Sequence, residues 1–453
     1  MSAVGLGAIP EETKLGILPS YDFFEKRTIC NQSLNGHTES LYPINGIQES
    51  NAGPIRFLIK GTSDYINFDK TYLFIRGKFK GKLPKAGATA ELVDIGDASE
   101  PKFSWVNLLP HAIFESVNIT LNNTTITMGD QHYAIRAYVQ TVLNSNPATL
   151  DTYGLMSGWF KDEGEWDSIS FNKNKALEKR RERANKELEC VFAIDICSPL
   201  FQMEKLLISN IDVEISLAKR TNAAYYMMHD IDGNCAFEIK DAVLRVRKVT
   251  PVPEIQASVE QYLMHKGPLT YILDDPRVVP ISVQQGERHI YKQYLTVGHH
   301  PKRLVILMVD SLAYTGQANR NPFRFQHFDL KQVILKKDGL EYPTPPIMTD
   351  FTNENYIDAY RHFLQSIQAD KNPFVPCLTE KDFANGMFML SWDMSPDQYG
   401  ADNPQALGEH NADISLSMDF AKALPMPITL LVYYQLEMRM TVNQARQVIV
   451  ETL

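Results

Sequence analysis

The sequence from residue 111 reads His111-Ala-Ile-Phe114-Glu-Ser-Val-Asn-Ile119-Thr-Leu121, and the sequence from residue 325 reads Phe325-Gln-His-Phe328-Asp-Leu-Lys-Gln-Val333-Ile-Leu335. Each stretch begins with aromatic residues and continues with a run of the composition and alternation typical of a β-strand. Polar turn residues follow in both cases, Asn-Asn-Thr after the first and Lys-Lys-Asp-Gly after the second. The two stretches therefore have the form of two copies of one strand and turn.

Three more pairs of similar segments follow in the same order along the chain. They are Arg136-Ala137-Tyr138 with Leu143 against Asp358-Ala359-Tyr360 with Leu364, Phe192 to Pro199 against Phe388 to Pro396, and Asp212 to Lys219 against Asp413 to Lys422. The separations run from 197 residues (396 − 199) to 222 residues (359 − 137). Ordered pairs at similar separations predict two copies of one β domain, joined head to tail.

The composition limits the class of protein. A chain of 453 residues has room for several domains with substantial cores. Apolar content of 44% and charged content of 22% are ordinary for a globular protein. The net charge of −9 argues against neutralisation of nucleic acid by the whole chain, which needs a basic face. Five cysteines without a CxxC spacing favour free thiols in a reducing compartment.

Neither a membrane span nor a secretory signal is predicted. The best apolar run, Ile428 to Tyr434, is far shorter than the roughly 18 to 20 residues that a spanning helix needs. The N-terminus has no basic segment followed by an apolar core. We therefore expect a protein that is not secreted.

The pattern of strands and turns divides the chain into five parts. We expect an N-terminal arm at 1–38, a first β domain at 39–250, a connection at 251–285, a second β domain at 286–440 and a C-terminal tail at 441–453. Short helices are predicted at 130–143 and 255–266. Many short strands with few helices predict all-β sandwiches of the Greek-key or jelly-roll kind. Long inserted loops at 144–190, 340–355 and 395–411 are predicted contact surfaces.

A search for catalytic motifs finds no strong one. HExxH and GxSxG are absent, and Gly77-Lys-Phe-Lys-Gly81-Lys82 is one residue short of a phosphate-binding loop, so we interpret it as a strand end. His299 and His300 are adjacent and would point to opposite faces of a strand, while His410 and Asp413 lack a partner histidine. We therefore predict no catalytic residues, no cofactor-binding residues and no metal ligands.

Two charged segments are interpreted as surface features. The stretch 173–189 alternates basic and acidic residues and is expected to form a solvated loop or exposed helix, with a binding patch as the alternative. The stretch Lys161 to Asp167 is expected to be a solvated loop anchored by Trp159 and Trp166. Paired catalytic acids or a calcium loop are alternatives there. Cys190 and Cys197 are expected to be core fillers.

Several segments together resemble a known family. In the first half they are Phe114 to Asn122, Ala137-Tyr138 and Arg245-Val-Arg-Lys-Val249; in the second half they are Leu295 to Asp310, Asn321-Pro-Phe-Arg-Phe-Gln-His-Phe-Asp-Leu330, Tyr356-Ile-Asp-Ala-Tyr360, Asp382-Phe-Ala-Asn-Gly386 and Leu424-Pro. They resemble the double jelly-roll major capsid proteins of Polinton/Maverick elements and their adintovirus relatives. The resemblance covers residues 40–440.

The resemblance implies two tandem eight-stranded jelly rolls with short helices and long inserted loops. It also implies homotrimeric, pseudo-hexagonal capsomers that tile an icosahedral shell around double-stranded DNA. The expected partners are other copies of the chain, penton and minor capsid proteins, and DNA at most weakly. The expected location is the virion, assembled in the cytoplasm or nucleus of the host cell. No enzymatic activity is expected.

Two alternatives stay open from the residues. One is a jelly-roll enzyme, such as a glycan-processing hydrolase or an oxygenase, which needs clustered acids or metal ligands in one cleft. The other is a glycan-binding protein, suggested by Trp105, Trp159 and Trp166 if these side chains lie on the surface.

Overall fold

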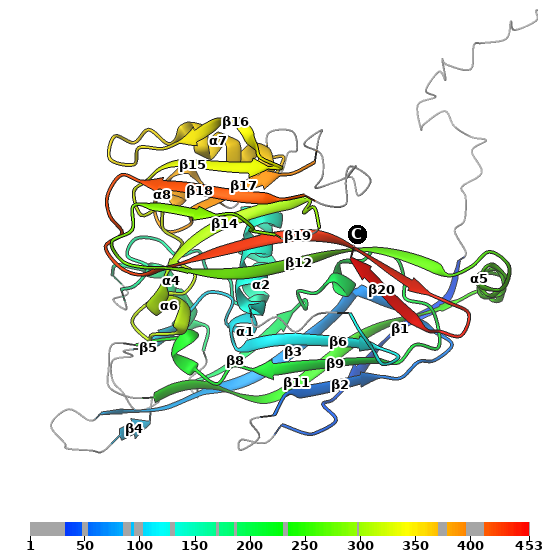
Figure 1. Ribbon diagram of the computed structural model, residues 1–453. Coiled ribbons are helices and arrows are strands. Elements are labelled where there is room, and N and C mark those ends of the chain that lie inside the picture. Colours follow the sequence, from blue (N-terminus) through cyan, green and yellow to red (C-terminus); the bar gives the residue numbers. More distant parts are fainter. Residues whose placement is uncertain are drawn as a thin grey trace, which may run out of the picture.

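A computed structural model gives the arrangement of the chain (Figure 1). It describes residues 32–47, 53–84, 92–94, 103–126, 132–168, 172–184, 188–229, 234–296, 299–369, 378–395 and 412–452. Most of the described residues in regular structure are in antiparallel strands, which form two β-sandwiches one above the other in the view of Figure 1.

The first jelly roll consists of two facing sheets. Its long sheet has the order β1-β11-β3, with β8 and the short β4 also paired to β3. The bounds are β1 (Ser33–Leu41), β3 (Tyr65–Pro84), β4 (Leu92–Asp94), β8 (Glu189–Ile194) and β11 (Asn234–Pro251). Its short sheet has the order β2-β9-β6-β7, with β2 (Ile55–Ile59), β6 (Phe114–Leu121), β7 (Thr124–Thr125) and β9 (Val213–Lys219).

The second jelly roll repeats this arrangement. Its long sheet has the order β12-β19-β14-β17, with β12 (Leu269–Val283), β14 (Arg303–Asp310), β17 (Met389–Asp393) and β19 (Ile428–Val442). Its short sheet has the order β13-β18-β15-β16, with β13 (His289–Lys292), β15 (Leu330–Lys337), β16 (Leu340–Met348) and β18 (Ile414–Phe420). Strand for strand, the chain order and the pairing order of the two long sheets and the two short sheets agree.

The segment pairs noticed in the sequence occupy equivalent places. They are the strands β6 and β15, the helices α2 (Tyr133–Asn144) and α7 (Ile357–Ser366), the strands β8 and β17, and the strands β9 and β18. The predicted all-β fold with two tandem eight-stranded jelly rolls is thereby confirmed, and so is the duplication that it implies. The second predicted helix also forms, as α5 (Pro253–His265).

The remaining elements decorate these sandwiches. The short helices are α1 (Leu109–Ala112), α3 (Pro147–Thr152), α4 (Lys175–Glu182), α6 (Ser311–Thr315) and α8 (Glu380–Ala384), and the 3-10 turns are Gly154–Ser157, Pro199–Gln202 and Ala223–Tyr225. A separate two-stranded ribbon pairs β5 (Phe103–Trp105) with β10 (Met227–His229). None of the helices in the described ranges is both long and apolar enough to cross a bilayer.

Strands also lie within the predicted connection and tail, and the domain boundaries themselves remain predictions. The predicted connection 251–285 contains β12, and β12 pairs with β19 over its whole length. The predicted tail contains β20 (Val448–Thr452), which pairs with the end of β19. The predicted arm lies outside the described residues as far as residue 31, and β1 begins within it at Ser33.

The C-terminal strand also ties the second jelly roll to the first. The backbone carbonyl of Val448 accepts a hydrogen bond from the Thr124 hydroxyl at 3.0 Å, and the carbonyl of Arg446 accepts one from the Asn122 amide at 2.9 Å. The Arg446 guanidinium donates to the Ser209 carbonyl at 2.9 Å and forms an ion pair with Glu260 on α5. The turn before β20 is thus bonded to the first jelly roll and to α5.

Side-chain alternation explains why these segments are strands. In β9 buried and partly exposed residues alternate, as expected for a sheet with one face on the core. In β14 every residue after Arg303 is buried, because both faces of the second long sheet are covered. The buried apolar residues of the two jelly rolls form one continuous cluster. The two sandwiches therefore share a core instead of being joined only by a linker.

Replacement of Phe79 by alanine tests the core of the first jelly roll. The Phe79 ring stacks on Trp105 at 4.2 Å and lies 4.9 Å from Phe237. We expect Phe79→Ala to lower the free energy of unfolding by about 3–5 kcal/mol because it leaves a cavity. Tyr291→Ala, at a side chain that is 56% exposed, should change it by no more than about 1 kcal/mol. Denaturant titrations of both variants measure the difference, and equal losses would contradict this account of the core.

Candidate functional site

The residues considered for chemistry do not form a metal centre. Within the described ranges no three or more His, Cys, Asp or Glu side chains gather in a way that could hold a metal ion. His300 is buried and His299 is half-buried, and His410 lies outside the described residues. Gly77 to Lys82 form part of β3, in line with the interpretation as strand. Cys190 is buried, whereas Cys197 is only partly buried, so the expected core position holds fully for one of the two.

The most elaborate arrangement of side chains is the joint between the two jelly rolls. On the first jelly roll it consists of α2, the segment 145–168 and α4; on the second it consists of the connection from α6 to β15, helix α8 and the outer face of the long sheet. Helix α2 stands between the two sandwiches in Figure 1, and residues 133 to 140 of it are all buried. A helix that is buried all round needs partners on every side.

Aromatic rings form the apolar centre of the joint. Tyr138 of α2 stacks on Phe323 with ring centroids 4.5 Å apart and an interplanar angle of 4°, and it meets Phe325 edge-on at 5.8 Å. Tyr225 lies edge-on to the same Phe323 at 6.2 Å. Such pairs stabilise a contact beyond the area that they bury. The first half supplies the tyrosines and the second half the phenylalanines.

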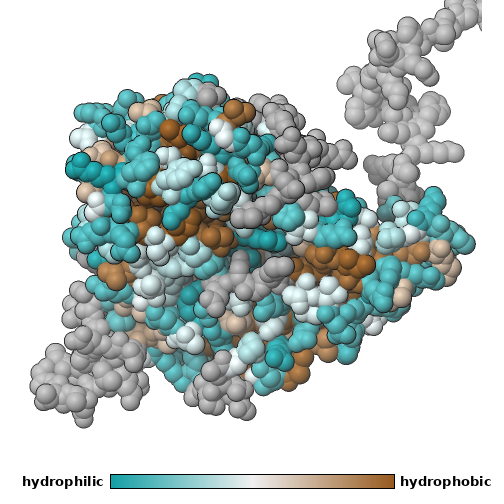
Figure 2. All heavy atoms as spheres, viewed as in Figure 1, coloured by the Kyte–Doolittle hydropathy of each residue, from teal (hydrophilic) through white to brown (hydrophobic). Residues whose placement is uncertain are grey.

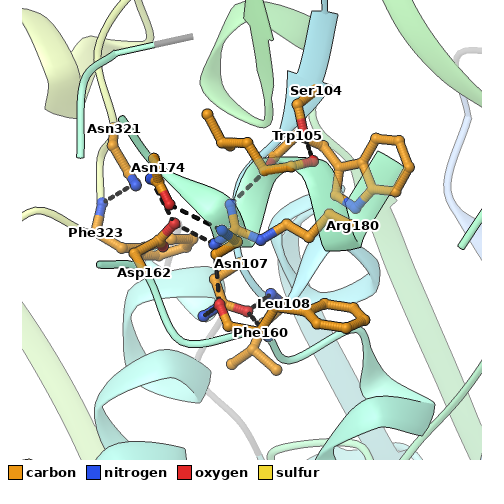
Figure 3. Close-up of polar contacts among 12 residues, drawn as sticks. Ser104, Trp105, Asn107, Leu108, Phe160, Asp162, Asn174, Arg180, Asn321 and Phe323 are labelled. Atoms are coloured by element: carbon orange, nitrogen blue, oxygen red, sulfur yellow. Dashed lines mark hydrogen bonds and ion pairs between the residues drawn. The ribbon is translucent and has the colours of Figure 1, made fainter. Parts of the chain in front are cut away.

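A buried ion pair holds the segment 145–168, which we call the inserted segment, in place. The side chains of Asp162 and Arg180 are both fully buried and form a salt bridge. Figure 3 shows the Arg180 guanidinium between Asp162 and two backbone carbonyls: it donates to the Trp105 carbonyl at 2.8 Å and to the Phe160 carbonyl at 3.0 Å. The Asn174 amide donates to the same Asp162 carboxylate at 3.0 Å. One cation therefore connects β5, the inserted segment and α4.

Neighbouring side chains satisfy the remaining backbone groups of this network. The Asn107 amide donates to the Phe160 carbonyl at 2.9 Å, and its oxygen accepts from the Phe160 N–H at 2.9 Å. The Asn174 oxygen accepts from the Ala176 N–H and so caps the start of α4.

The interpretation of 173–189 as a solvated surface element is wrong at Arg180, and the interpretation of 161–167 as a solvated loop is wrong at Asp162, because both side chains are fully buried. Burial of a charge requires a partner of opposite charge, and each residue is the partner of the other.

The next residues of the inserted segment reach the second jelly roll. The Asp167 carboxylate accepts a hydrogen bond from the Asn321 N–H at 2.9 Å and forms an ion pair with Arg324. Lys161 forms an ion pair with Asp382 at 2.6 Å, and Asp382 also completes the capping box at the start of α8. Asp162 and Asp167 of this segment are therefore bound to cations of the joint, whereas Glu163 and Glu165 are exposed, and Glu165 pairs with Lys173 at 2.9 Å.

A glycine allows the closest approach between the two halves. Gly386 has a φ of +106°, and a Cβ atom at this position would lie 2.6 Å from the indole of Trp166. Any larger residue would push Trp166 away from the second jelly roll. Trp166 and Trp159 are both 3% exposed, as expected for anchors of the segment. The segments at 321–330 and 382–386, which carry much of the family resemblance, thus supply residues of the joint.

A buried histidine beside the joint is held in one protonation state. The Tyr133 hydroxyl lies 2.9 Å from Nδ1 of His111 and accepts a hydrogen bond from the Cys197 N–H at 3.3 Å. The hydroxyl and Nδ1 share one hydrogen bond, in which the donor depends on the tautomer of the ring. Burial lowers the pKa of His111 to about 4. The imidazole contacts the tyrosine hydroxyl and not the thiol, so these residues do not form a nucleophile with its base.

The polar pocket beside these residues holds no activated acid–base pair. It has a volume of about 520 Å³, and its lining includes His111, Gln140, Tyr153 and Asp195. The Tyr153 hydroxyl donates to Asp195 at 2.8 Å. Burial, together with this hydrogen bond and nearby carboxylates, raises the pKa of Tyr153 to about 12, while burial raises the pKa of Asp195. A phenol with a pKa this high stays protonated at neutral pH, so Tyr153 does not serve as a general base there.

The sequence alone gave no signal for the pairing of Asp162 with Arg180. The two residues lie in segments whose charges alternate in sign, and nothing in that alternation marks one acid or one arginine as buried. Asn174 before Lys175 is a recognisable helix cap, and it is the one feature that could have placed the start of α4 and hence Arg180 on its inner face.

Removal of one member of the buried ion pair should be costly. We expect Arg180→Met or Asp162→Leu alone to lower the free energy of unfolding by about 3–5 kcal/mol, because each leaves the other charge buried without its partner. The double variant should lose less than the sum of the two single losses. Denaturant titration of the four proteins in a double-mutant cycle measures the coupling, and strictly additive losses would show that the two charges do not depend on each other.

The protonation of His111 predicts how stability depends on pH. The pKa of this histidine is about 4 in the folded protein and about 6.5 in an unfolded chain. The unfolded chain therefore binds more protons between these values, and stability falls as the pH decreases from 6.5 to 4, by about 3 kcal/mol for this group. In His111→Gln this contribution is absent. Denaturation midpoints between pH 7 and pH 4 should fall less steeply for the variant, and parallel curves would contradict the assignment.

Comparisons with known proteins bear on the fold. No protein-family model matches the chain. The chain is 19% identical over 378 residues to an uncharacterized protein of Caenorhabditis elegans. The aligned region covers 82% of this chain and 87% of that protein.

Solved structures match along nearly the full length. A chain of the Sputnik virophage has a TM-score of 0.65 and 10% identity, covering 100% of this chain and 94% of that one. The mavirus major capsid protein has a TM-score of 0.58 and 10% identity, covering 98% and 97% of the two chains. The Faustovirus major capsid protein has a TM-score of 0.57 and 8% identity, covering 94% and 92%. The chain therefore has the double jelly-roll fold that these viral capsid proteins share.

Proposed function

We propose that the chain is a major capsid protein that assembles as homotrimeric, pseudo-hexagonal capsomers and tiles an icosahedral shell around double-stranded DNA. The observation that carries the proposal is the tandem pair of jelly rolls of identical strand order, fused through a buried joint. The likeness to viral capsid chains over nearly the whole length supports it. Its role is structural and requires neither catalysis nor a cofactor.

The symmetry of a trimer explains why a chain of two similar sandwiches suits a shell. A closed ring of three chains, each with two similar sandwiches, presents six similar sides, so that near-equivalent contacts can repeat across a lattice. A jelly roll also keeps most strand edges inside its packed sheets, which limits uncontrolled edge-to-edge association. Both properties suit a protein that must associate many times and only in one way.

The proposed partners follow from the same role. They are other copies of the chain, first in the trimer and then between capsomers, together with penton and minor capsid proteins. A net charge of −9 favours at most weak contact with the packaged DNA. The proposed location is the virion, assembled inside the host cell.

The glycan-binding alternative loses its main support. Trp105 is fully buried, and Trp159 and Trp166 are each 3% exposed, so these three rings cannot form a platform for sugars. Of the acids around 161–167 that a glycan-processing enzyme could use, Asp162 and Asp167 are held in ion pairs of the joint. The alternative is kept only as a competing hypothesis, which hits on a glycan array would favour.

Exposed apolar side chains favour self-association. Figure 2 shows apolar surface beside the C-terminal strand. Ile272 of β12 is 40% exposed and Ile449 of β20 is 54% exposed. Elsewhere Leu340 is 76% and Ile357 is 52% exposed. Apolar areas of this kind are typical of surfaces that bind other proteins.

The oligomeric state tests the proposed function. We expect the purified protein to have three times the mass of the chain in light scattering coupled to size exclusion, at micromolar concentration and moderate salt. Interfaces of an obligate trimer bury on the order of 2,000 Å² or more per contact, so dilution to nanomolar concentration should not dissociate it. A monodisperse monomer at micromolar concentration would contradict the proposal.

A further inference from the structure

The joint within one chain brings together two different surfaces. The first jelly roll contributes α2 and its surroundings: Arg136 donates to the Pro276 carbonyl of β12 at 3.4 Å, and Gln140 interacts with Tyr433 of β19. The second jelly roll contributes the outer face of its long sheet, to which Tyr433 and its ladder neighbour Val305 belong. On the central strand β14 of this sheet, every residue after Arg303 is buried.

The first jelly roll has its own copy of that sheet surface, and it is uncovered. Along β3 the residues Tyr72, Arg76 and Lys80 are exposed while the residues between them are buried or partly buried. Val191 on β8, which pairs with Arg76, is 44% exposed. We call this surface, the outer side of the long sheet of the first jelly roll, the sheet face.

The second jelly roll likewise has an uncovered copy of α2. Ile357, Asp358, Arg361 and Gln365 form an exposed stripe along α7, which we call the helix face. With Ala359 aligned to Ala137, the equivalent residues of α2 are Ile135, Arg136, Val139 and Leu143, and all four are buried. Each chain thus uses one copy of each surface internally and leaves the other copy open.

The charges of the two open surfaces are complementary. The sheet face carries more basic than acidic side chains: Arg76, Lys78, Lys80, Lys240, Arg245 and Arg247 against Glu189, Glu238 and Asp241. The helix face and its exposed surroundings carry more acidic than basic ones: Asp350, Glu354, Asp358 and Glu380 against Arg361 and Lys381. Attraction between such surfaces steers association and fixes its orientation.

From these observations we infer that the sheet face of one copy binds the helix face of a second copy, so that the contact between chains repeats the joint within the chain. The inference rests on the proposed trimer and names the surfaces that form it. The contact is head-to-tail, because the two surfaces differ, and such contacts give closed rings when the rotation closes. Three chains then alternate internal and external joints around six jelly rolls.

Two variants damage the two surfaces separately. The sheet variant carries Arg76→Glu and Val191→Glu, and the helix variant carries Ile357→Lys and Asp358→Lys. Each places charge opposite like charge in the proposed contact, so each should dissociate at a protein concentration about a thousandfold higher than the wild type or more, and be monomeric at micromolar concentration. The matched controls Arg56→Glu and Glu214→Lys lie on β2 and β9 of the short sheet and should stay trimeric.

A mixture of the two variants gives the sharpest result. The helix variant retains its sheet face and the sheet variant retains its helix face, so this contact between them is intact. The two altered faces, with lysines on one and glutamates on the other, are again opposite in charge. We expect an equimolar mixture to associate in light scattering, as dimers or larger rings, at concentrations where each variant alone is monomeric. A mixture that stays monomeric, or variants that remain trimeric alone, would overturn the inference. A wild type that does not form a trimer would instead overturn the proposed function.

Cross-linking of the wild-type trimer does not depend on how the variants fold. A carbodiimide joins lysines to carboxylates in direct contact, and products between chains are separated from those within a chain by mixing isotope-labelled and unlabelled protein. We expect links between chains to join Lys78 or Lys80 to Glu354 or Asp358. Links between chains that join only other surfaces would overturn the inference.

Discussion

The strand β14 in the long sheet of the second jelly roll is apolar on both faces from Leu304 to Val309, and this one property constrains the rest of the structure. β14 and β17 are buried along nearly their whole length, so the sheet cannot have water on its outer side. The first jelly roll supplies the cover with α2, a helix that is itself buried all round. Neither half would keep its apolar surface out of water without the other, and the two sandwiches therefore share one core.

The polar groups at the joint give this contact its geometry. Apolar surfaces alone permit sliding, whereas the buried pair of Asp162 with Arg180 and the pairing of Asp167 with Asn321 and Arg324 fix the inserted segment in one position. Charges at such places can cost stability compared with apolar residues of the same shape, and they are retained where one arrangement must be selected. A building unit whose halves must meet at a constant angle is a case of this kind.

The sequence predicted the duplication, because similar segments recur in the same order, and the helices α2 and α5, because these depend on local patterns. It did not predict the strand β12 within 251–285, where Pro276 and Pro280 are unusual residues for a strand. Both prolines are tolerated there because β12 lies at the edge of its sheet and pairs on one side with β19. The burial of Arg180 could not be predicted, since it depends on carbonyls of Trp105 and Phe160 that are distant in the sequence. Long-range contacts of this type leave no periodic signal.

Electron cryo-microscopy of the purified protein tests most directly whether a chain of two equivalent sandwiches is a unit of a larger ring. The account predicts particles with three-fold symmetry and a hexagonal outline, in which six sandwiches surround one axis and are joined alternately within and between chains. Two-lobed single chains, or particles in which the two sandwiches of a chain take variable angles, would contradict it.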